Sequence, residues 1–587
     1  MRLIEIRLLE GPNVYRLEPV VKVELALGRR RTFYGERSPA RHALVRLGAT
    51  VPARAWPDPI AAIAGWLQRL RADHGENVGR LTVHRSSDPG FWILAVPWVG
   101  ADRARTIVEA ALALAERDVS SSRTARLTGH QERAVARWTA RIDDARTTPA
   151  AWIRDADRTV PIVSISGTNG KSTVTRLVTH ILVMAGRRVG TTTSDGVLVD
   201  ERMIDAGDWT GPGGAQMVLA RSDVEVAVLE TARGGIVLRG VGYESNDVSV
   251  LTNVSADHLD LQGIHTLPEL AEVKSVICRI TRPDGWVVLN ADDSLVVAIR
   301  RRVRGRVALF STTRAGSTVA ARHAAAGGRA YVLRDGTDLY ELDGERASKI
   351  VDVARVPITI GGIARHNVAN VLAAAAAARG LGATIEQVRR GLVDFSPTAA
   401  QSPGRLNLFR LGQRVVIVDF AHNEAGVSAV LDVAEGIAGG ASGRTAPITA
   451  IVGTAGDRPD DTLRGIGRIA AQRAQRVVIK ETRKYLRGRT QASVIGEIMA
   501  GIASGGVARD RVPVYASETE ALQAELNGTG PQPASDGARP DSPRVIVLMC
   551  HEDRDGVFEL LASLGARPVD VAAELTELVP RLRGRRG

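Results

Sequence analysis

Apolar runs of strand length alternate with stretches of helical periodicity over most of the chain. The run Pro161–Ser166 leads through a glycine-rich turn into a predicted helix at Ser172–Ala185. Further apolar runs share this length and this alternation with helices: Val224–Leu229, Val248–Leu251, Trp286–Leu289, Arg414–Asp419, Ile448–Gly453, Arg476–Ile479 and Arg544–Met549. Strands that alternate with helices are typical of doubly wound parallel sheets, so we predict an α/β fold.

Breaks in this pattern predict three domains. An opening strand of alternating charged and aliphatic residues is followed by helical stretches such as Pro59–Ala72 and Ala104–Arg117. A Pro/Ser segment at Ser396–Pro403 separates two later series of strands, and a Gly/Pro/Asp/Ser-rich stretch at Asn527–Pro543 predicts a flexible loop. We therefore expect an N-terminal α+β domain, a central doubly wound domain and a C-terminal Rossmann-like domain, over residues 1–155, 156–398 and 399–587.

Composition excludes several classes of function. The formal net charge of +12 comes mainly from arginine, since only six of the 77 basic residues are lysine. These charges are spread along the chain and aromatic residues make up only 4%, so we expect no nucleic-acid partner. The start lacks the apolar stretch of a signal peptide, and the alanine run Ala373–Ala378 is too short to span a bilayer, which predicts a cytoplasmic protein with no membrane partner. Two cysteines, Cys278 and Cys550, argue against a disulfide framework and against a four-ligand zinc site.

The segment Gly167–Ser172 has the features of a phosphate-binding loop. It follows an apolar strand, contains two glycines and places Lys171 and Ser172 at the start of a helix. Backbone N–H groups freed by such a turn point at an anion, and the helix N-terminus adds positive potential. We expect Lys171 to neutralise the terminal phosphates of a nucleotide and Ser172 to hold Mg²⁺. The common P-loop pattern has glycine where this sequence has Ile165. A tight strand–helix turn would explain the glycines but not the adjoining Lys-Ser pair.

Two later strand ends carry further candidate side chains. Glu230 ends the apolar run that begins at Val224, and a carboxylate beside a phosphate loop is well placed to hold Mg²⁺, directly or through water. His258 lies just past the next strand, where a ligand role competes with a structural one. The run Thr231–Gly235 adds Arg233 and paired glycines at the edge of the sheet where ligands of α/β folds collect.

Together these residues resemble the Mur ligase family. The motifs that carry the resemblance run from the phosphate loop into the C-terminal part: Gly167–Thr173, Glu230, Asn253 with Asp257 and His258, Lys274, Asn290–Asp293, His366 and Asn367 with Asn370, and Asp419–Asn423. Within the family, the ligase half of cyanophycin synthetase is the most similar, through the runs Thr191–Gly196, Asp208–Pro212 and Leu229–Gly235. The start, Arg7–Asn13, resembles the N-terminal domain of that enzyme. Between Arg123 and Pro161 there is no room for the ATP-grasp domain that the enzyme carries.

The resemblance implies an ATP-dependent amide ligase with a central ATPase domain and a C-terminal ligase domain. In this family ATP phosphorylates an acceptor carboxylate, and an amine then attacks the acyl phosphate. By the same resemblance, the catalytic residues are Lys171, Glu230, His258 and Lys274, and one or two Mg²⁺ ions are held by Ser172, Glu230 and His258. ATP is then bound by Gly167, Thr168, Asn169, Gly170, Lys171, Ser172, Thr173, Asn290, Arg405 and Asp419.

The resemblance also implies that one lysine is chemically modified and that certain residues lie near the substrates. Lys274 matches a lysine that is carbamylated in many family members, and carbamylation needs a neutral amine, which arginine cannot supply. A surface lysine on a helix is the alternative. Lys480-Glu481 and Arg487–Arg489 resemble the part of cyanophycin synthetase that lies near the incoming amino acid. The alternative is a solvated loop. The residues expected near the substrates are Thr192, Asp195, Thr210, Arg233, His422 and Asn423.

The expected substrates are an amino acid, with arginine as a candidate, and a carboxylate-bearing peptide or polymer. A polyglutamate-type or cell-wall-precursor Mur ligase is an alternative, although the N-terminal residues do not resemble a UDP-sugar-binding domain. A non-catalytic nucleotide-binding partner of a full-length synthetase is a second alternative, which the presence of all four catalytic candidates disfavours. A homo-oligomer is left open.

Overall fold

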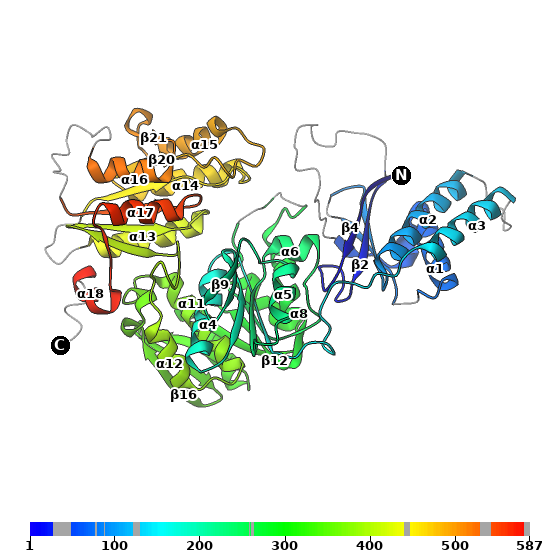
Figure 1. Ribbon diagram of the computed structural model, residues 1–587, viewed down its shortest axis with the longest axis horizontal. Helices are drawn as coiled ribbons and strands as arrows, with labels where there is room; N and C mark the ends of the chain where they lie inside the picture. The colour runs from blue at the N-terminus through cyan, green and yellow to red at the C-terminus, as the bar shows by residue number, and fades with distance from the viewer. Residues whose placement is uncertain are drawn as a thin grey trace.

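Three β-sheets follow one another along the part of the chain that the structure describes (Figure 1). The structure is a computed structural model, and it describes residues 1–27, 48–76, 79–86, 88–120, 129–256, 259, 263–439, 446–528 and 542–579. Most of the flexible loop predicted at Asn527–Pro543 lies outside these residues. Each sheet is built from one continuous stretch of sequence, and the α/β fold class predicted from the apolar pattern is confirmed.

The N-terminal sheet is antiparallel, and helices cover one of its faces. Its order is β1-β2-β5-β4-β3, and alternate residues of the second strand, such as Val21 and Val23, pack against the helices. The strands are β1 (Arg2–Leu9), β2 (Val20–Ala26), β3 (Gly48–Thr50), β4 (Thr82–Ser86) and β5 (Phe91–Pro97). The helices are α1 (Asp58–Asp73), α2 (Ala101–Ser120) and α3 (Gly129–Asp144).

The central sheet is parallel in its middle and antiparallel at both edges. Its strands are β6 (Ile162–Ser166), β7 (Val189–Thr192), β8 (Gly196–Val199), β9 (Arg202–Ala206), β10 (Val226–Glu230), β11 (Asn246–Leu251), β12 (Thr281–Asn290), β13 (Arg306–Ser311), β14 (Arg329–Arg334), β15 (Asp338–Asp343) and β16 (Arg346–Asp352). The order is β16-β15-β14-β13-β12-β11-β6-β10-β7-β8-β9, and the strands from β14 to β7 pair in parallel. The antiparallel additions β8-β9 and β15-β16 were not predicted, because these strands are short or partly exposed and lack a continuous apolar run.

Helices cover both faces of the central sheet, which makes it doubly wound. They are α4 (Lys171–Met184), α5 (Pro212–Leu219), α6 (Arg233–Leu238), α7 (Leu267–Lys274), α8 (Val276–Arg279), α9 (Ser294–Ala298), α10 (Arg314–Ala325), α11 (Arg365–Gly380) and α12 (Ile385–Asp394). α4, α11 and α12 share one core with alternate strand residues such as Val163, while α5 to α10 share the other core with residues such as Ile162. The alanine run Ala373–Ala378 is buried in α11, where small side chains let the helix approach the sheet closely.

The C-terminal sheet has the order β21-β20-β19-β22-β18-β17-β23, and the strands from β21 to β18 pair in parallel. Its strands are β17 (Asn407–Leu411), β18 (Arg414–Asp419), β19 (Ile448–Val452), β20 (Arg476–Lys480), β21 (Val514–Tyr515), β22 (Arg544–Met549) and β23 (Arg567–Pro568). Its helices are α13 (Glu424–Ala438), α14 (Asp460–Arg473), α15 (Gln491–Ser504), α16 (Glu518–Asn527), α17 (Arg554–Ser563) and α18 (Val571–Leu578). α16 and α17 pack on one face, and the other helices pack on the opposite face.

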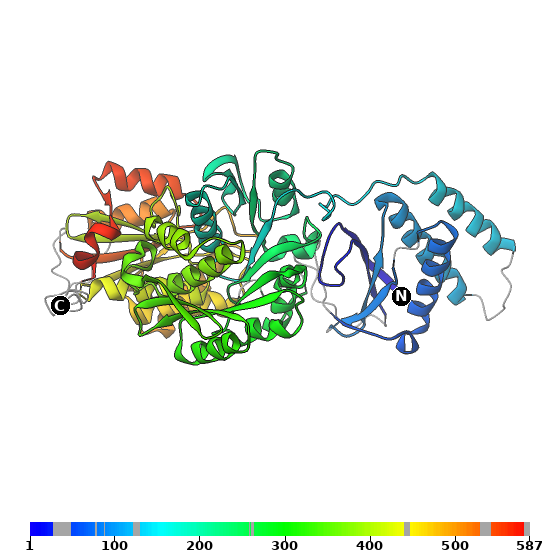
Figure 2. The same ribbon diagram turned by 90° about the horizontal axis from the view of Figure 1, so that it is seen from below.

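The three parts meet in the order in which they follow along the chain, and an extended segment joins α3 to β6 (Figure 2). The N-terminal part docks on the central part through backbone hydrogen bonds: Glu10 N–H donates to the Arg239 carbonyl at 2.8 Å, and Val241 N–H donates to the Pro12 carbonyl at 2.8 Å. No helix within the described ranges combines the length and the apolar character needed to cross a lipid bilayer. The domain limits at residues 155 and 398 remain predictions.

His180 of α4 joins three elements of the central part. Its Nδ1 lies 2.9 Å from Glu201 Oε1, in the β8–β9 hairpin, and its Nε2 lies 2.9 Å from Asp394 Oδ2, at the end of α12. Burial of the ring opposes protonation, but the hydrogen bonds and charges of the two carboxylates outweigh it and raise the pKa of His180 above its ordinary value. Both ring nitrogens can donate only when the ring is protonated.

We predict that the stabilising effect of His180 is lost as the pH rises. Because the folded pKa is raised, this contribution is fully present below the unfolded pKa of about 6.5 and disappears as the pH passes the folded pKa. The difference in melting temperature between the wild type and His180→Gln should therefore be largest near about pH 6 and shrink toward about pH 9. Thermal unfolding over this pH range checks the prediction, and a difference that stays constant with pH would contradict it.

Candidate active site

The phosphate loop joins β6 to α4, and its two glycines are packed without spare room. Gly167 has a φ angle of 149° and Gly170 one of 84°, both in the region that favours glycine. A Cβ atom on Gly167 would lie 1.9 Å from Thr252 Oγ1, and one on Gly170 would lie 2.3 Å from Asn370 Oδ1. Residues that follow β11 and residues of α11 therefore fix the backbone of this loop.

Hydrogen bonds to Asn253 hold the same loop from the side. Thr168 N–H donates to the Asn253 carbonyl at 2.8 Å, and Asn169 N–H donates to Asn253 Oδ1 at 2.9 Å. The Asn253 amide returns a bond to the Asn169 carbonyl at 3.0 Å. Asn253 follows β11, which pairs in parallel with β6, so the segment after the neighbouring strand holds the loop in its conformation.

Both predicted lysines reach this loop. Lys171 Nζ, at the first position of α4, donates to the Thr168 carbonyl at 2.9 Å. Lys274 Nζ, at the end of α7, donates to the Gly167 carbonyl at 2.7 Å, and its side chain is buried. The alternative of a surface lysine therefore fails for Lys274.

Glu230 ends β10 beside the start of α4 and is a suitable oxygen ligand for a divalent cation. Its side chain is 3% exposed, and Oε2 has no hydrogen-bond partner. Burial raises the pKa of Glu230, while the charges of Lys171 and Arg405 and a contact with the Ser172 hydroxyl act in the opposite direction. A buried, unpartnered carboxylate oxygen beside a hydroxyl fits a hard cation such as Mg²⁺, which prefers oxygen ligands.

His258, the other predicted metal ligand, lies outside the described residues. Among those that are described, no cluster of three or more His, Cys, Asp or Glu side chains could hold a metal ion by itself. A cation at Ser172 and Glu230 would therefore complete its shell with water molecules or with oxygens of a bound phosphate.

An amide pair joins the phosphate loop to the C-terminal part. Asn423 Nδ2 donates to Asn169 Oδ1 at 3.0 Å, and Asn169 Nδ2 donates to Asn423 Oδ1 at 3.3 Å. Asn423 also caps α13, because its Oδ1 accepts from Gly426 N–H at 2.8 Å. The start of α13 is therefore tied directly to the loop, across 254 residues of sequence.

Arg405 approaches the loop from the same side. Its guanidinium lies 4.6 Å from the centre of the Phe420 ring, and Nη2 donates to Ser172 Oγ at 3.4 Å. Asp419, at the end of β18, accepts from Leu406 N–H at 2.7 Å. Burial raises the pKa of Asp419, and the nearby charge of Arg405 opposes that shift.

A cavity of about 410 Å³ lies between the central and C-terminal parts, within the range of about 300–1,000 Å³ that is usual for small-molecule sites. The Asn290 amide, on the cavity wall, donates to the Thr252 carbonyl at 2.8 Å. The central part lines the cavity with residues that include Asn169, Gly170, Thr173, Asn253, Asn290, His366 and Asn370. The C-terminal part adds Arg405, Asp419, Phe420, Ala421 and His422. Burial lowers the pKa of His366 to about 4, so a neutral imidazole faces the cavity.

The residues expected near the substrates fall into two groups. Thr192 and Thr210 are buried and line a small void with Glu230, next to α6, which begins at Arg233. The Thr210 hydroxyl donates to Asp208 Oδ1 at 2.6 Å. His422 instead lines the cavity of about 410 Å³, and Asn423 lies at the loop, where it contacts Asn169.

Asp195 is held between two arginines. Arg176 of α4 donates to its Oδ2 at 2.8 Å, and Arg554 of α17 donates to its Oδ1 at 2.8 Å. Burial opposes ionisation of Asp195, but Arg554, Arg176 and Arg405 outweigh it and lower its pKa. The carboxylate therefore stays charged and connects the central part to the C-terminal part.

Sequence reasoning missed Arg176, Arg554 and His551 near the site. Arg554 contacts Asp195 across 359 residues, and no local pattern reports such a pairing. His551 lies two positions after β22 ends, so the rule that pointed to Glu230, a polar side chain at the end of a parallel strand, could have found it.

Comparisons with known proteins agree with this architecture. The model of the Mur ligase middle domain matches residues 165–378, and the model of the Mur ligase glutamate ligase domain matches residues 404–534. A cyanophycin synthetase from Crocosphaera subtropica is 41% identical over 368 residues, which cover 63% of this chain and 41% of that protein. The chain thus spans about two fifths of the length of this relative.

One further relative and one solved structure are also similar to this chain. A UDP-N-acetylmuramoyl-L-alanyl-D-glutamate–2,6-diaminopimelate ligase from Alkalilimnicola ehrlichii is 30% identical over 387 residues, which cover 64% of this chain and 71% of that protein. The solved structure of Mycobacterium tuberculosis folylpolyglutamate synthase with ADP and AMPPCP has a TM-score of 0.48 and 20% identity, over 70% of this chain and 92% of that one. With two matching domain models and a 30% identical relative covered over most of its length, the chain belongs to the Mur ligase family.

Proposed function

We propose that the chain is an ATP-dependent amide ligase that joins the amine of an amino acid to an acceptor carboxylate. One observation carries the proposal. A fixed phosphate loop and a buried carboxylate with an unpartnered oxygen lie beside a cavity that two α/β parts share. Membership of the Mur ligase family supports it, because the relatives are named as ligases or synthetases.

The reaction must convert a poor electrophile into a good one. The acceptor carboxylate attacks the terminal phosphorus of ATP, which gives an acyl phosphate and ADP. The amine then attacks the acyl carbon, phosphate leaves, and the amide forms after loss of a proton. The protein has little covalent chemistry to perform, so positioning and charge neutralisation account for most of the catalysis. Lys171, at the start of α4, supplies positive charge at the loop.

Ser172 and Glu230 would hold Mg²⁺ in this scheme. A bound Mg²⁺ neutralises charge that develops on the phosphate oxygens. Burial of Glu230 keeps the ligand in a water-poor surrounding, where electrostatic interactions are stronger than in bulk solvent. His258 remains our candidate ligand for a second ion.

Arg405 and Asp419 bring the C-terminal part into the reaction. Arg405 already contacts Ser172, and the Asn169–Asn423 amide pair holds the same side of the cavity closed. An acyl phosphate hydrolyses in water, so a cavity enclosed between two parts suits this chemistry, and we expect the two parts to close on the substrates.

The identity of the two substrates is inferred from the similarity of this chain to particular relatives. Similarity to cyanophycin synthetase favours a peptide or polymer acceptor with arginine as the incoming amino acid, near Thr192, Thr210 and Arg233. Because no ATP-grasp domain fits between Arg123 and Pro161, we propose that the chain acts on a short peptide, on a different acceptor or on a product made by a partner enzyme. A polyglutamate-type or cell-wall-precursor ligase is the alternative within the same chemistry.

We predict that phosphate release from ATP requires an amine and a carboxylate together. The assay scans single amino acids, arginine first, against acidic peptides in the presence of Mg²⁺. Lys171→Met should lower turnover by roughly 10²- to 10³-fold, because one preorganised charge at the phosphates is lost. Lys349→Met is the matched control, since Lys349 is 48% exposed and remote from the loop. Tight ATP binding without turnover on any pair would contradict the ligase and favour a non-catalytic partner of a full-length synthetase.

Two glycine substitutions test nucleotide binding at the loop. Gly170 and Gly186 flank α4 with almost equal φ angles of 84° and 85°. A Cβ on Gly170 would clash with Asn370, whereas a Cβ on Gly186 meets nothing within 4 Å. We expect Gly170→Ala to weaken ATP binding by at least about tenfold and Gly186→Ala to leave it unchanged, while both cost about 1 kcal/mol of backbone strain. Calorimetric titration with Mg²⁺–ATP measures this, and equal affinities for the two variants would argue against the loop as the nucleotide site.

A third prediction concerns carbamylation of Lys274. The buried amine lies at the loop, where an added carboxylate could support the metal. We expect turnover of the wild type to rise with added bicarbonate, and Lys274→Arg to lose at least about tenfold in turnover together with the bicarbonate response. Retained activity in Lys274→Arg, or a wild type indifferent to bicarbonate, would exclude a carbamylated lysine.

A further inference from the structure

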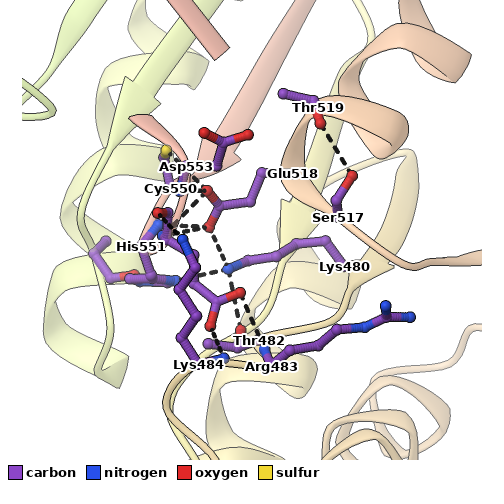
Figure 3. A network of polar contacts seen from close by, with 12 residues as sticks. Lys480, Thr482, Arg483, Lys484, Ser517, Glu518, Thr519, Cys550, His551 and Asp553 are labelled. Atoms are coloured by element: carbon purple, nitrogen blue, oxygen red, sulfur yellow. Dashed lines mark hydrogen bonds and ion pairs between the residues drawn. The ribbon is translucent and has the colours of Figure 1, made fainter. Parts of the chain in front are cut away.

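The buried ammonium of Lys480, at the end of β20, uses all three of its hydrogens (Figure 3). Nζ donates to Glu518 Oε1 at 2.6 Å, to Thr482 Oγ1 at 3.1 Å and to His551 Nδ1 at 3.0 Å. The side chain is 0% exposed. Lys480 is therefore turned away from solvent, and its ammonium group interacts with side chains inside the C-terminal part.

This arrangement fixes the proton on His551. An ammonium can only donate, so His551 Nδ1 must accept and the ring proton must reside on Nε2. His551 Nε2 then donates to the Ala421 carbonyl at 3.0 Å. The packed surroundings of the ring and the charge of Lys480 hold the pKa of His551 well below its usual range, so the neutral tautomer persists. The imidazole thus links Lys480, through two hydrogen bonds, to the backbone that follows β18.

Glu518 anchors the other end of this network. Its carboxylate accepts from the backbone N–H groups of His551 at 2.6 Å and Asp553 at 2.8 Å, and from Cys550 Sγ at 3.2 Å. Burial opposes ionisation of Glu518, but the charge and hydrogen bond of Lys480 and the interactions with His551, including its backbone N–H, lower the pKa of Glu518 to about 2. The segment after β22 is therefore tied to the start of α16, with His551 on it.

The same imidazole supports the aromatic ring beneath Arg405. The rings of His551 and Phe420 meet edge to face, with centroids 5.1 Å apart. The Arg405 guanidinium lies 4.6 Å from the centre of the Phe420 ring and reaches Ser172 Oγ at 3.4 Å. A continuous series of contacts thus runs from Lys480 through His551 and Phe420 to the phosphate loop.

We propose that His551 is a positioning residue for phosphoryl transfer: it holds the Phe420–Ala421 segment and, through the Phe420 ring, Arg405 at the phosphate loop. Lys480 and Glu518 set its tautomer and its place. This inference rests on the proposed ligase function and deepens it. It also assigns Lys480 to the support of this loop, whereas the family resemblance had put Lys480-Glu481 near the incoming amino acid.

A double-mutant cycle tests the proposal. The variants are His551→Phe, which keeps an aromatic ring but removes both ring nitrogens, Arg405→Met, and the combination. Turnover and the dissociation constant of Mg²⁺–ATP are measured for each. His551→Phe alone should lower turnover about tenfold, whereas in the Arg405→Met background the same change should have less than about a twofold effect. The amide of His551→Gln can accept from Lys480 and donate to Ala421, so this variant should restore most of the loss and remains available if the phenylalanine variant does not fold.

The control cycle pairs Arg405→Met with Tyr331→Phe, which removes a buried hydroxyl donor to Glu341 far from the loop. Its effects should multiply, as expected for independent sites. If the effects of His551→Phe and Arg405→Met also multiply, or if His551→Gln is as impaired as His551→Phe, the proposal is overturned. A wild type that binds ATP without turnover would instead refute the ligase function, and the cycle measured on the dissociation constant would still decide whether His551 acts through Arg405.

Discussion

The close packing of the phosphate loop is the constraint on which the rest of the site depends. Gly167 and Gly170 are packed against Thr252 and Asn370, which leave no room for a side chain at either position and restrict the backbone of the loop. Parallel pairing of β6 with β10 and β11 brings Glu230 and Asn253 to the same edge of the sheet. Asn253 accepts from the N–H groups of Thr168 and Asn169, and the N–H groups at the start of α4 remain for a phosphate, with a reduced ordering cost at the moment of binding.

Charges around that loop are arranged so that the C-terminal part completes the site. Burial raises the pKa values of Glu230 and Asp419, while the charge of Arg405 acts in the opposite direction on both carboxyl groups. Asp195 has the opposite shift because arginines on both sides keep it ionised. The Asn169–Asn423 pair and the Arg405–Ser172 contact add polar links across the same boundary. The residues proposed to bind ATP are therefore divided between two parts, and neither part holds all of them.

The parts of this arrangement that could be predicted are those with a clear pattern among residues close in sequence. Short apolar runs predict the strands that end at Ser166, Glu230 and Asp419. The glycines, lysine and serine of the loop form a recognisable motif after the first of these strands. The edge hairpin β8-β9 is short and its outer strand is exposed, so its pattern was too weak to predict. The buried contact of Lys274 with Gly167 spans 107 residues, and such pairings appear only when the chain is folded. His258, central to the expected metal site, lies outside the residues that the structure describes.

A crystal structure with Mg²⁺ and a non-hydrolysable ATP analogue would show directly whether the loop is the nucleotide site. We predict the base and ribose in the cavity between Asn290 and Asp419, the terminal phosphate on the loop from Gly167 to Ser172, and Mg²⁺ in contact with Glu230. A nucleotide bound at any other place, or a loop occupied without a cation at Glu230, would contradict this prediction.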